Sequence, residues 1–154
     1  MTCVGSIYAK PINCYFCCQL RQSNLNNLMF TITSAYIFTV LTTIVIIFQG
    51  CLAAGVPWGQ ASMGGRYPGK YPGKMRVVAV MNMLILALMA ALVLSKANML
   101  FPGLQSIAHI GIWVVVVFFV VGTIMNIITP SKIERIWAPV AFFQLVTSFI
   151  VAIN

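Results

Sequence analysis

Four long apolar runs divide this chain, and they constrain its fold more than any other feature of the sequence. We place them at residues 28–54, 77–95, 107–129 and 132–153. Each has about the 20 residues that an α-helix needs to cross a ~30 Å hydrocarbon core, and none carries a charge in its middle. The pattern predicts an all-α polytopic membrane protein, with four transmembrane helices in a compact bundle.

The composition supports a lipid-facing surface. The 154 residues are 61% hydrophobic and 6% charged, whereas about a quarter of the residues of a soluble domain are charged. So few polar side chains cannot cover a water-facing surface, and the length allows one domain. The first run is longer than the roughly 7–15 apolar residues of a signal peptide, so a cleaved leader is the less favoured interpretation.

The basic residues gather on one side of the predicted bundle. Nine Lys and Arg stand against one acid, and Lys10, Arg21 and Lys96 fall on the sparser side. The six in or beside the first and third connectors are Arg66, Lys70, Lys74, Arg76, Lys132 and Arg135. Because basic connectors stay in the cytoplasm, we expect both termini outside and these six bases against anionic lipid headgroups. Bases between apolar runs favour a membrane surface, and not nucleic acid, as the partner.

The first connector contains the segment GVPWGQASMGGRYPGKYPGKMR, residues 55–76. Its repeated Tyr-Pro-Gly-Lys unit predicts two successive type II turns, since Pro presets φ and Gly accepts a positive φ. Four aromatic residues on this side are expected to anchor at the headgroup level: Trp58, Tyr67, Tyr71 and Trp137. The glycine spacing does not match a phosphate-binding P-loop.

The single acid, Glu134, stands three residues after Ser131 and just before the apolar part of the fourth run. This spacing predicts a capping box, in which the serine hydroxyl accepts the Glu134 amide and the carboxylate returns to the serine amide. A pairing of Glu134 with a base of the first connector is the alternative.

Three amide side chains lie inside the predicted spans: Asn82, Asn126 and Gln144. Polar groups in a bilayer usually hydrogen-bond to other helices, so we expect these three to join helices or to line a path. Asn82 and Asn126 fall at similar depth and are expected to meet. His109, near the other end of the third span, needs no special role.

Residues 1–27 form a cysteine-containing tail, for which we expect poor order, and Met29 is an alternative start. One Cys-x-x-Cys pair (Cys14 and Cys17), with Cys3 and Cys18 beside it, is a weak signal for zinc, so we predict no metal and no cofactor. The apolar parts of the spans lack the Asp or Glu that a cation-coupled transporter usually needs. No catalytic pattern is present, and we do not expect an enzyme.

The motifs GVPWG, GG and YPGKMR after the first span, with SKIERIWAP opening the fourth, resemble those of small uncharacterised bacterial four-helix integral membrane proteins. The resemblance covers Met29 to Asn154 and leaves the cysteine-containing tail unmatched. It implies a four-helix fold in a bacterial cytoplasmic (inner) membrane and brings no known activity.

We therefore expect a structural or accessory component that contacts anionic lipid, or a membrane protein partner, through its basic connectors. The alternative is a small solute channel or transporter built as a homo-oligomer, with the three amides lining its path.

Overall fold

The computed structural model describes residues 12–154, with side chains from Cys18 onwards except that of Pro102. The four α-helices are α1 (Ile12–Ala54), α2 (Gly73–Lys96), α3 (Gln105–Ile128) and α4 (Trp137–Ile153). Short 3-10 turns lie between them: η1 (Gly59–Ala61), η2 (Met63–Gly65), η3 (Pro102–Leu104) and η4 (Glu134–Ile136). The predicted all-α bundle is confirmed, and four helical segments are long and apolar enough to cross a membrane.

Two helix boundaries differ from the predicted ones. Helix α1 begins at Ile12, so residues 12–27, expected as a tail, are helical, while residues 1–11 lie outside the described part. Neither Gly nor Pro interrupts the sequence between residues 12 and 49, so nothing in it breaks the helix. Helix α4 begins at Trp137, after η4. Pro139 then falls in the first turn, where its missing amide costs no helical hydrogen bond.

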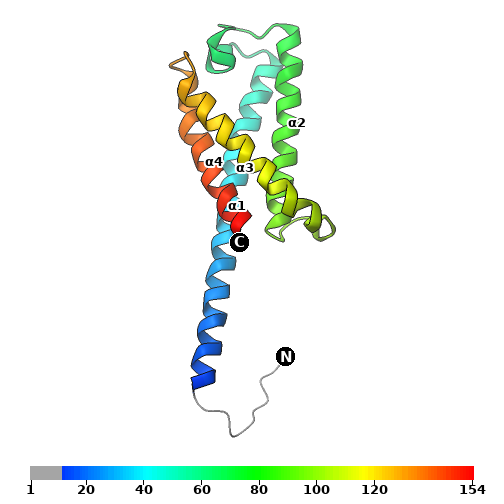
Figure 1. The fold of residues 1–154 in the computed structure, drawn as a ribbon. Coiled ribbons are helices and arrows are strands. Elements are labelled where there is room, and N and C mark those ends of the chain that lie inside the picture. Colours follow the sequence, from blue (N-terminus) through cyan, green and yellow to red (C-terminus); the bar gives the residue numbers. More distant parts are fainter. Residues whose placement is uncertain (1–11) are drawn as a thin grey trace.

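The helices place the connectors at two ends of the bundle (Figure 1). The α1–α2 and α3–α4 connectors lie together at one end, and the α2–α3 connector lies at the other. Helix α3 runs from the end of α2 towards the start of α4, so α2 and α3 separate as they approach the first end. Helix α1 extends well past the other three helices towards the N-terminus.

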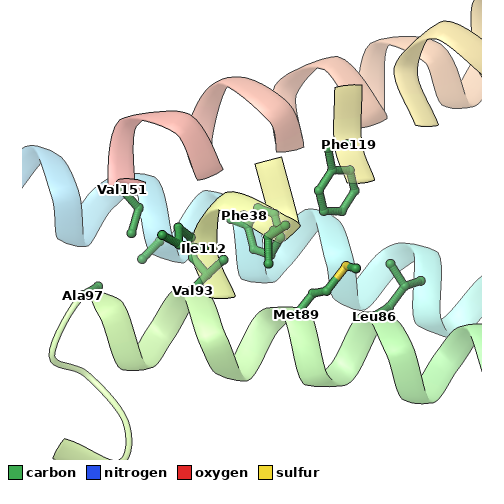
Figure 2. Close-up of a cluster of buried hydrophobic side chains, with 10 residues drawn as sticks. Phe38, Leu86, Met89, Val93, Ala97, Ile112, Phe119 and Val151 are labelled. Carbon is green, nitrogen blue, oxygen red and sulfur yellow. The ribbon is translucent and has the colours of Figure 1, made fainter. Parts of the chain in front are cut away.

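The half of the bundle nearer the α2–α3 connector is filled by an apolar core to which all four helices contribute (Figure 2). Phe38 of α1 meets Phe119 of α3 edge to face, with ring centroids 5.3 Å apart. The other large buried members are Leu86, Met89, Val93, Ile112, Val115 and Val151. Apolar residues also cover the outside of the bundle, such as Ile110, which is 75% exposed. A surface of this kind suits lipid and not water.

A second, smaller cluster lies at the other end, beneath the first connector. It consists of Phe48, Leu52, Ala61, Tyr71 and Ala79, with Trp137 packed against it. Because these residues come from α1, the first connector, α2 and α4, the cluster attaches the connectors to the helices.

Candidate functional site

The α1–α2 and α3–α4 connectors form one structure, which we call the connector platform (residues 55–72 and 129–136). Three hydrogen bonds join residues about 70 positions apart in the chain. Ser131 Oγ donates to the Gln60 carbonyl (2.9 Å), and Trp137 Nε1 donates to the Ala61 carbonyl (3.1 Å). The Gly64 amide donates to Glu134 Oε2 (2.8 Å). The platform is therefore held by specific bonds between the two connectors.

Glu134 lies at the centre of this junction, and only half of the predicted capping box is present. Its amide donates to Ser131 Oγ (3.3 Å), as expected. Its carboxylate does not return to the serine amide; instead, Oε2 accepts from Gly64 N and from Thr129 Oγ1 (2.5 Å). Its contact with the first connector is thus with a backbone amide and not with a basic side chain. Gly64 has φ +70°, the left-handed region that favours glycine.

Glycine also determines the path of the first connector. The Gly59 amide donates to the Gly69 carbonyl (3.0 Å), which closes the connector on itself. A Cβ at Gly59 would lie 2.3 Å from the Tyr67 carbonyl oxygen. Gly69 has φ +92°, which suits the first predicted type II turn. The second Pro-Gly instead starts α2, since Gly73 is its first residue, so the prediction of two successive turns is wrong for the second unit.

All six basic residues of the two connectors lie at this end of the bundle. Five of them are exposed and lie on or beside the platform surface: Arg66, Lys70, Lys74, Lys132 and Arg135. Two of the six are arginines that also support the platform. Arg135 Nε donates to the Thr129 carbonyl (3.2 Å), and Arg76 Nε donates to the Tyr71 carbonyl (3.1 Å). The platform therefore combines exposed positive charge with two structural arginines.

The four aromatic residues predicted as interfacial anchors do not share one environment. Trp58 is 51% exposed and stacks on Phe48, with centroids 6.3 Å apart. Trp137 is half-buried and lies 4.6 Å from the same phenylalanine. Tyr67 is half-buried and meets Tyr71 edge to face. Tyr71 is only 3% exposed, so it is part of the platform core and not a lipid-facing anchor.

The Tyr71 hydroxyl is buried and makes no hydrogen bond of acceptable geometry with any described residue. Burial raises the pKa of this hydroxyl, and the nearby Glu134 and Tyr67 raise it further, while the proximity of Ser62 acts in the opposite direction. The phenol is therefore a neutral donor without a protein acceptor.

The three amide side chains predicted within the spans also lie in different environments. Gln144 is 2% exposed, and its Nε2 donates to Thr42 Oγ1 (2.9 Å), which joins α4 to α1. Asn126 donates to the Gly122 carbonyl of its own helix (2.8 Å) and so does not form the expected pair with Asn82. Asn82 and Asn126 instead line the same two cavities.

Those cavities lie beneath the platform. The inner cavity, about 190 Å³, lies among the four helices and reaches Phe119, Gln144 and Trp137. The α2–α3 groove, about 860 Å³, lies where α2 and α3 separate. The two adjoin, since both are lined by Gln49, Ser62, Asn82, Gly122, Asn126 and Glu134. Sequence reasoning missed Gln49, Ser62 and Gly122, although the polar side chain of Gln49 within an apolar run was a usable signal.

The metal-ligating side chains of the described part of the chain do not cluster. No group of three His, Cys, Asp or Glu residues could hold a metal ion there. His109 is exposed near the start of α3, outside both cavity linings. Cys18 and Cys51 are free thiols, while Cys3 lies outside the described residues.

The four apolar helices and their lipid-compatible surface define a multi-pass integral membrane protein. Comparison of the chain with protein-family models, with curated proteins and with solved structures finds no match.

Proposed function

We propose that this protein is an accessory component of a bacterial cytoplasmic membrane, and that its connector platform faces the cytoplasm and contacts anionic lipid headgroups. The observation that carries the proposal is the gathering of Arg66, Lys70, Lys74 and Lys132 at one end of the bundle, where all four are exposed. Each base close to an anionic surface contributes about 1 kcal/mol of attraction. Basic connectors also favour retention on the cytoplasmic side.

The rigidity of the platform supports this function. The connectors are joined by the bonds of Ser131, Glu134 and Trp137, so the bases are presented from a fixed surface and not from mobile loops. The exposed indole of Trp58 lies on the same end and suits the headgroup region. By contrast, α2 ends in Lys96 at the opposite end, so positive charge is much sparser there.

The apolar core counts against a solute path through one copy of the chain. Beyond the inner cavity, Phe38, Phe119 and Ile112 fill the space between the helices. The inner cavity is therefore closed by packed side chains on the side of the α2–α3 connector.

The test is quenching of tryptophan fluorescence by brominated lipids. A Trp113→Phe variant leaves Trp58 and Trp137, both at the platform. In vesicles of phosphatidylcholine mixed with phosphatidylglycerol, we expect brominated phosphatidylglycerol to quench this variant more strongly than brominated phosphatidylcholine. The added changes Lys70→Gln, Lys74→Gln and Lys132→Gln should reduce the difference strongly, whereas Lys96→Gln should preserve it. Equal quenching by both lipids without these changes would contradict the proposal.

A further inference from the structure

The α2–α3 groove differs from the rest of the lipid-facing surface because it is large and partly polar. Its volume of about 860 Å³ falls within the roughly 300–1,000 Å³ typical of ligand sites. It lies between two spanning helices, so a ligand could enter it sideways from the bilayer. The inner cavity adjoins it and extends it towards the bundle centre.

The groove occupies one half of the membrane thickness. Its lining on α2 extends from Met75 to Ile85, which is about 15 Å at 1.5 Å per residue. The hydrocarbon core is ~30 Å thick. Because the groove begins beside the platform and ends near the middle of α2, it is open to the leaflet on the platform side.

The chemistry of the lining changes with depth. At the platform rim lie the Arg66 side chain, Tyr67 and Ser62. Deeper in the groove, Asn82 of α2 and Asn126 of α3 contribute amides. The remaining walls are apolar and include Val78, Met81, Ile85, Met125 and Ile128. A positive rim, a polar middle and apolar walls match an amphiphile that lies with its head at the platform.

The groove presents hydrogen-bond donors, and one buried donor beside it lacks an acceptor. The buried Tyr71 hydroxyl has no hydrogen-bond acceptor among the described residues, and it lies near Ser62 and Glu134, which also line the groove. A polar group without a partner is costly in a hydrocarbon environment. The exposed guanidinium of Arg66 and the amide nitrogens of Asn82 and Asn126 suit a ligand rich in phosphate and ester oxygens, whereas the Tyr71 hydroxyl lies behind the groove wall.

We propose that the groove binds one anionic phospholipid from the leaflet on the platform side. Its phosphate lies at the Arg66 rim, its ester carbonyls lie at the level of Asn82 and Asn126, and an acyl chain follows the apolar walls. The proposal rests on the proposed function, because it names a specific site beside the platform that contacts headgroups. The one acid at the rim, Glu134, already accepts two hydrogen bonds through Oε2, and the surrounding connectors remain strongly basic.

Gly122 offers a direct way to block the groove. It lines both cavities, and a Cβ at this position would meet no atom within 4 Å. The Cβ of Gly122→Leu therefore enters open space, its side chain narrows the groove, and leucine favours a helix more than glycine does. Val117→Leu is the matched control, because Val117 is on the same helix, is exposed and lines neither cavity.

The experiment is native mass spectrometry of the full chain released from vesicles of phosphatidylcholine mixed with phosphatidylglycerol. We expect one retained phosphatidylglycerol per chain in the wild type and in Val117→Leu, and at least about a tenfold lower occupancy in Gly122→Leu. Asn126→Leu, which removes a donor without filling the groove, should also lower occupancy. Circular dichroism and thermal unfolding establish that each variant is folded.

Several outcomes would overturn the groove proposal: a wild type that retains no lipid, equal retention of phosphatidylcholine, retention of a polar solute in place of lipid, or full retention by folded Gly122→Leu. The triple variant of Lys70, Lys74 and Lys132 separates the two proposals, because none of these lysines lines the groove. It should lower the quenching preference of the platform strongly and still retain the groove lipid. If brominated phosphatidylglycerol quenches more strongly but no lipid is retained in a one-to-one ratio, the proposed function of the platform stands and the proposed lipid site in the groove is refuted.

Discussion

The substitution Gly59→Ala tests whether the connector platform is as tightly closed as the structure indicates. An added Cβ would lie 2.3 Å from the Tyr67 carbonyl oxygen and 2.9 Å from the Gly69 carbonyl oxygen. Both are backbone atoms, so no side chain can turn aside to make room. The connector must open, and the bond from Gly59 N to the Gly69 carbonyl (3.0 Å) is then lost.

The size of the effect follows from two contributions. Overpacking of a closely packed site costs about 1–3 kcal/mol, and loss of one hydrogen bond adds about 0.5–1.5 kcal/mol. We therefore expect roughly 2–4 kcal/mol of destabilisation. For a chain of this length, each kcal/mol lowers Tm by about 2–4 °C, so Tm should fall by roughly 5–15 °C.

The assay is thermal unfolding in one detergent, followed by intrinsic tryptophan fluorescence, since Trp58 and Trp137 report on the platform. Gly73→Ala is the control, because a Cβ at Gly73 meets nothing within 4 Å at the start of α2. Its Tm should equal or slightly exceed that of the wild type. A Gly59→Ala protein that unfolds within about a degree of the control would show that this connector is loosely packed.

Three further predictions concern single polar groups. Gln144→Leu removes the hydrogen bond from α4 to Thr42 of α1 and should lower the unfolding free energy by about 0.6–1.7 kcal/mol. A double-mutant cycle with Thr42→Val measures the coupling between the two side chains. A coupling energy near zero would refute the prediction. Glu134→Ala leaves Gly64 N and Thr129 Oγ1 without their acceptor and should cost roughly 1–3 kcal/mol, with a shift in Trp137 fluorescence; Lys132→Ala, nearby and exposed, is its control. Because burial raises the pKa of Tyr71 above its usual value of about 10, the folded state holds this proton more tightly than the unfolded state. The stabilisation that this proton contributes is therefore fully present below about pH 10 and is lost as the pH rises further. The unfolding free energy of the wild type, measured against pH, should fall above pH 10 more steeply than that of Tyr71→Phe. Parallel pH dependences of the two proteins would contradict this.

The spans could be predicted because membrane thickness fixes the length of an apolar helix. Residues 77–95 and 107–129 predicted α2 and α3 to within a few residues. The charge pattern and the capping motif predicted only part of the contacts within the connectors. Spacing predicted the bond between Ser131 and the Glu134 amide, but not the direction of the carboxylate. That direction depends on an amide presented by Gly64 in a left-handed conformation, some 70 residues away.

Two residues show why the rest of the site was not predictable. Tyr71 has the sequence context of an interfacial anchor, yet closure of the connector between Gly59 and Gly69 buries it. Asn82 and Asn126 were placed at the same depth, but the separation of α2 from α3 leaves a groove where a contact was expected. Both outcomes depend on tertiary geometry that local patterns do not contain.

The length of α1 has a mechanical consequence. Its 43 residues span about 65 Å at 1.5 Å per residue, roughly twice the ~30 Å hydrocarbon core. Without Gly or Pro between residues 12 and 49, this part of the helix lacks the usual sites of a sharp kink. We expect it to act as a stiff lever, so that a sideways load on its far end tilts Phe48 and the platform with it. Spin labels at Leu20 and Ala54, both exposed, should report one narrow distance distribution near ~50 Å, and a broad one would reveal a hinge.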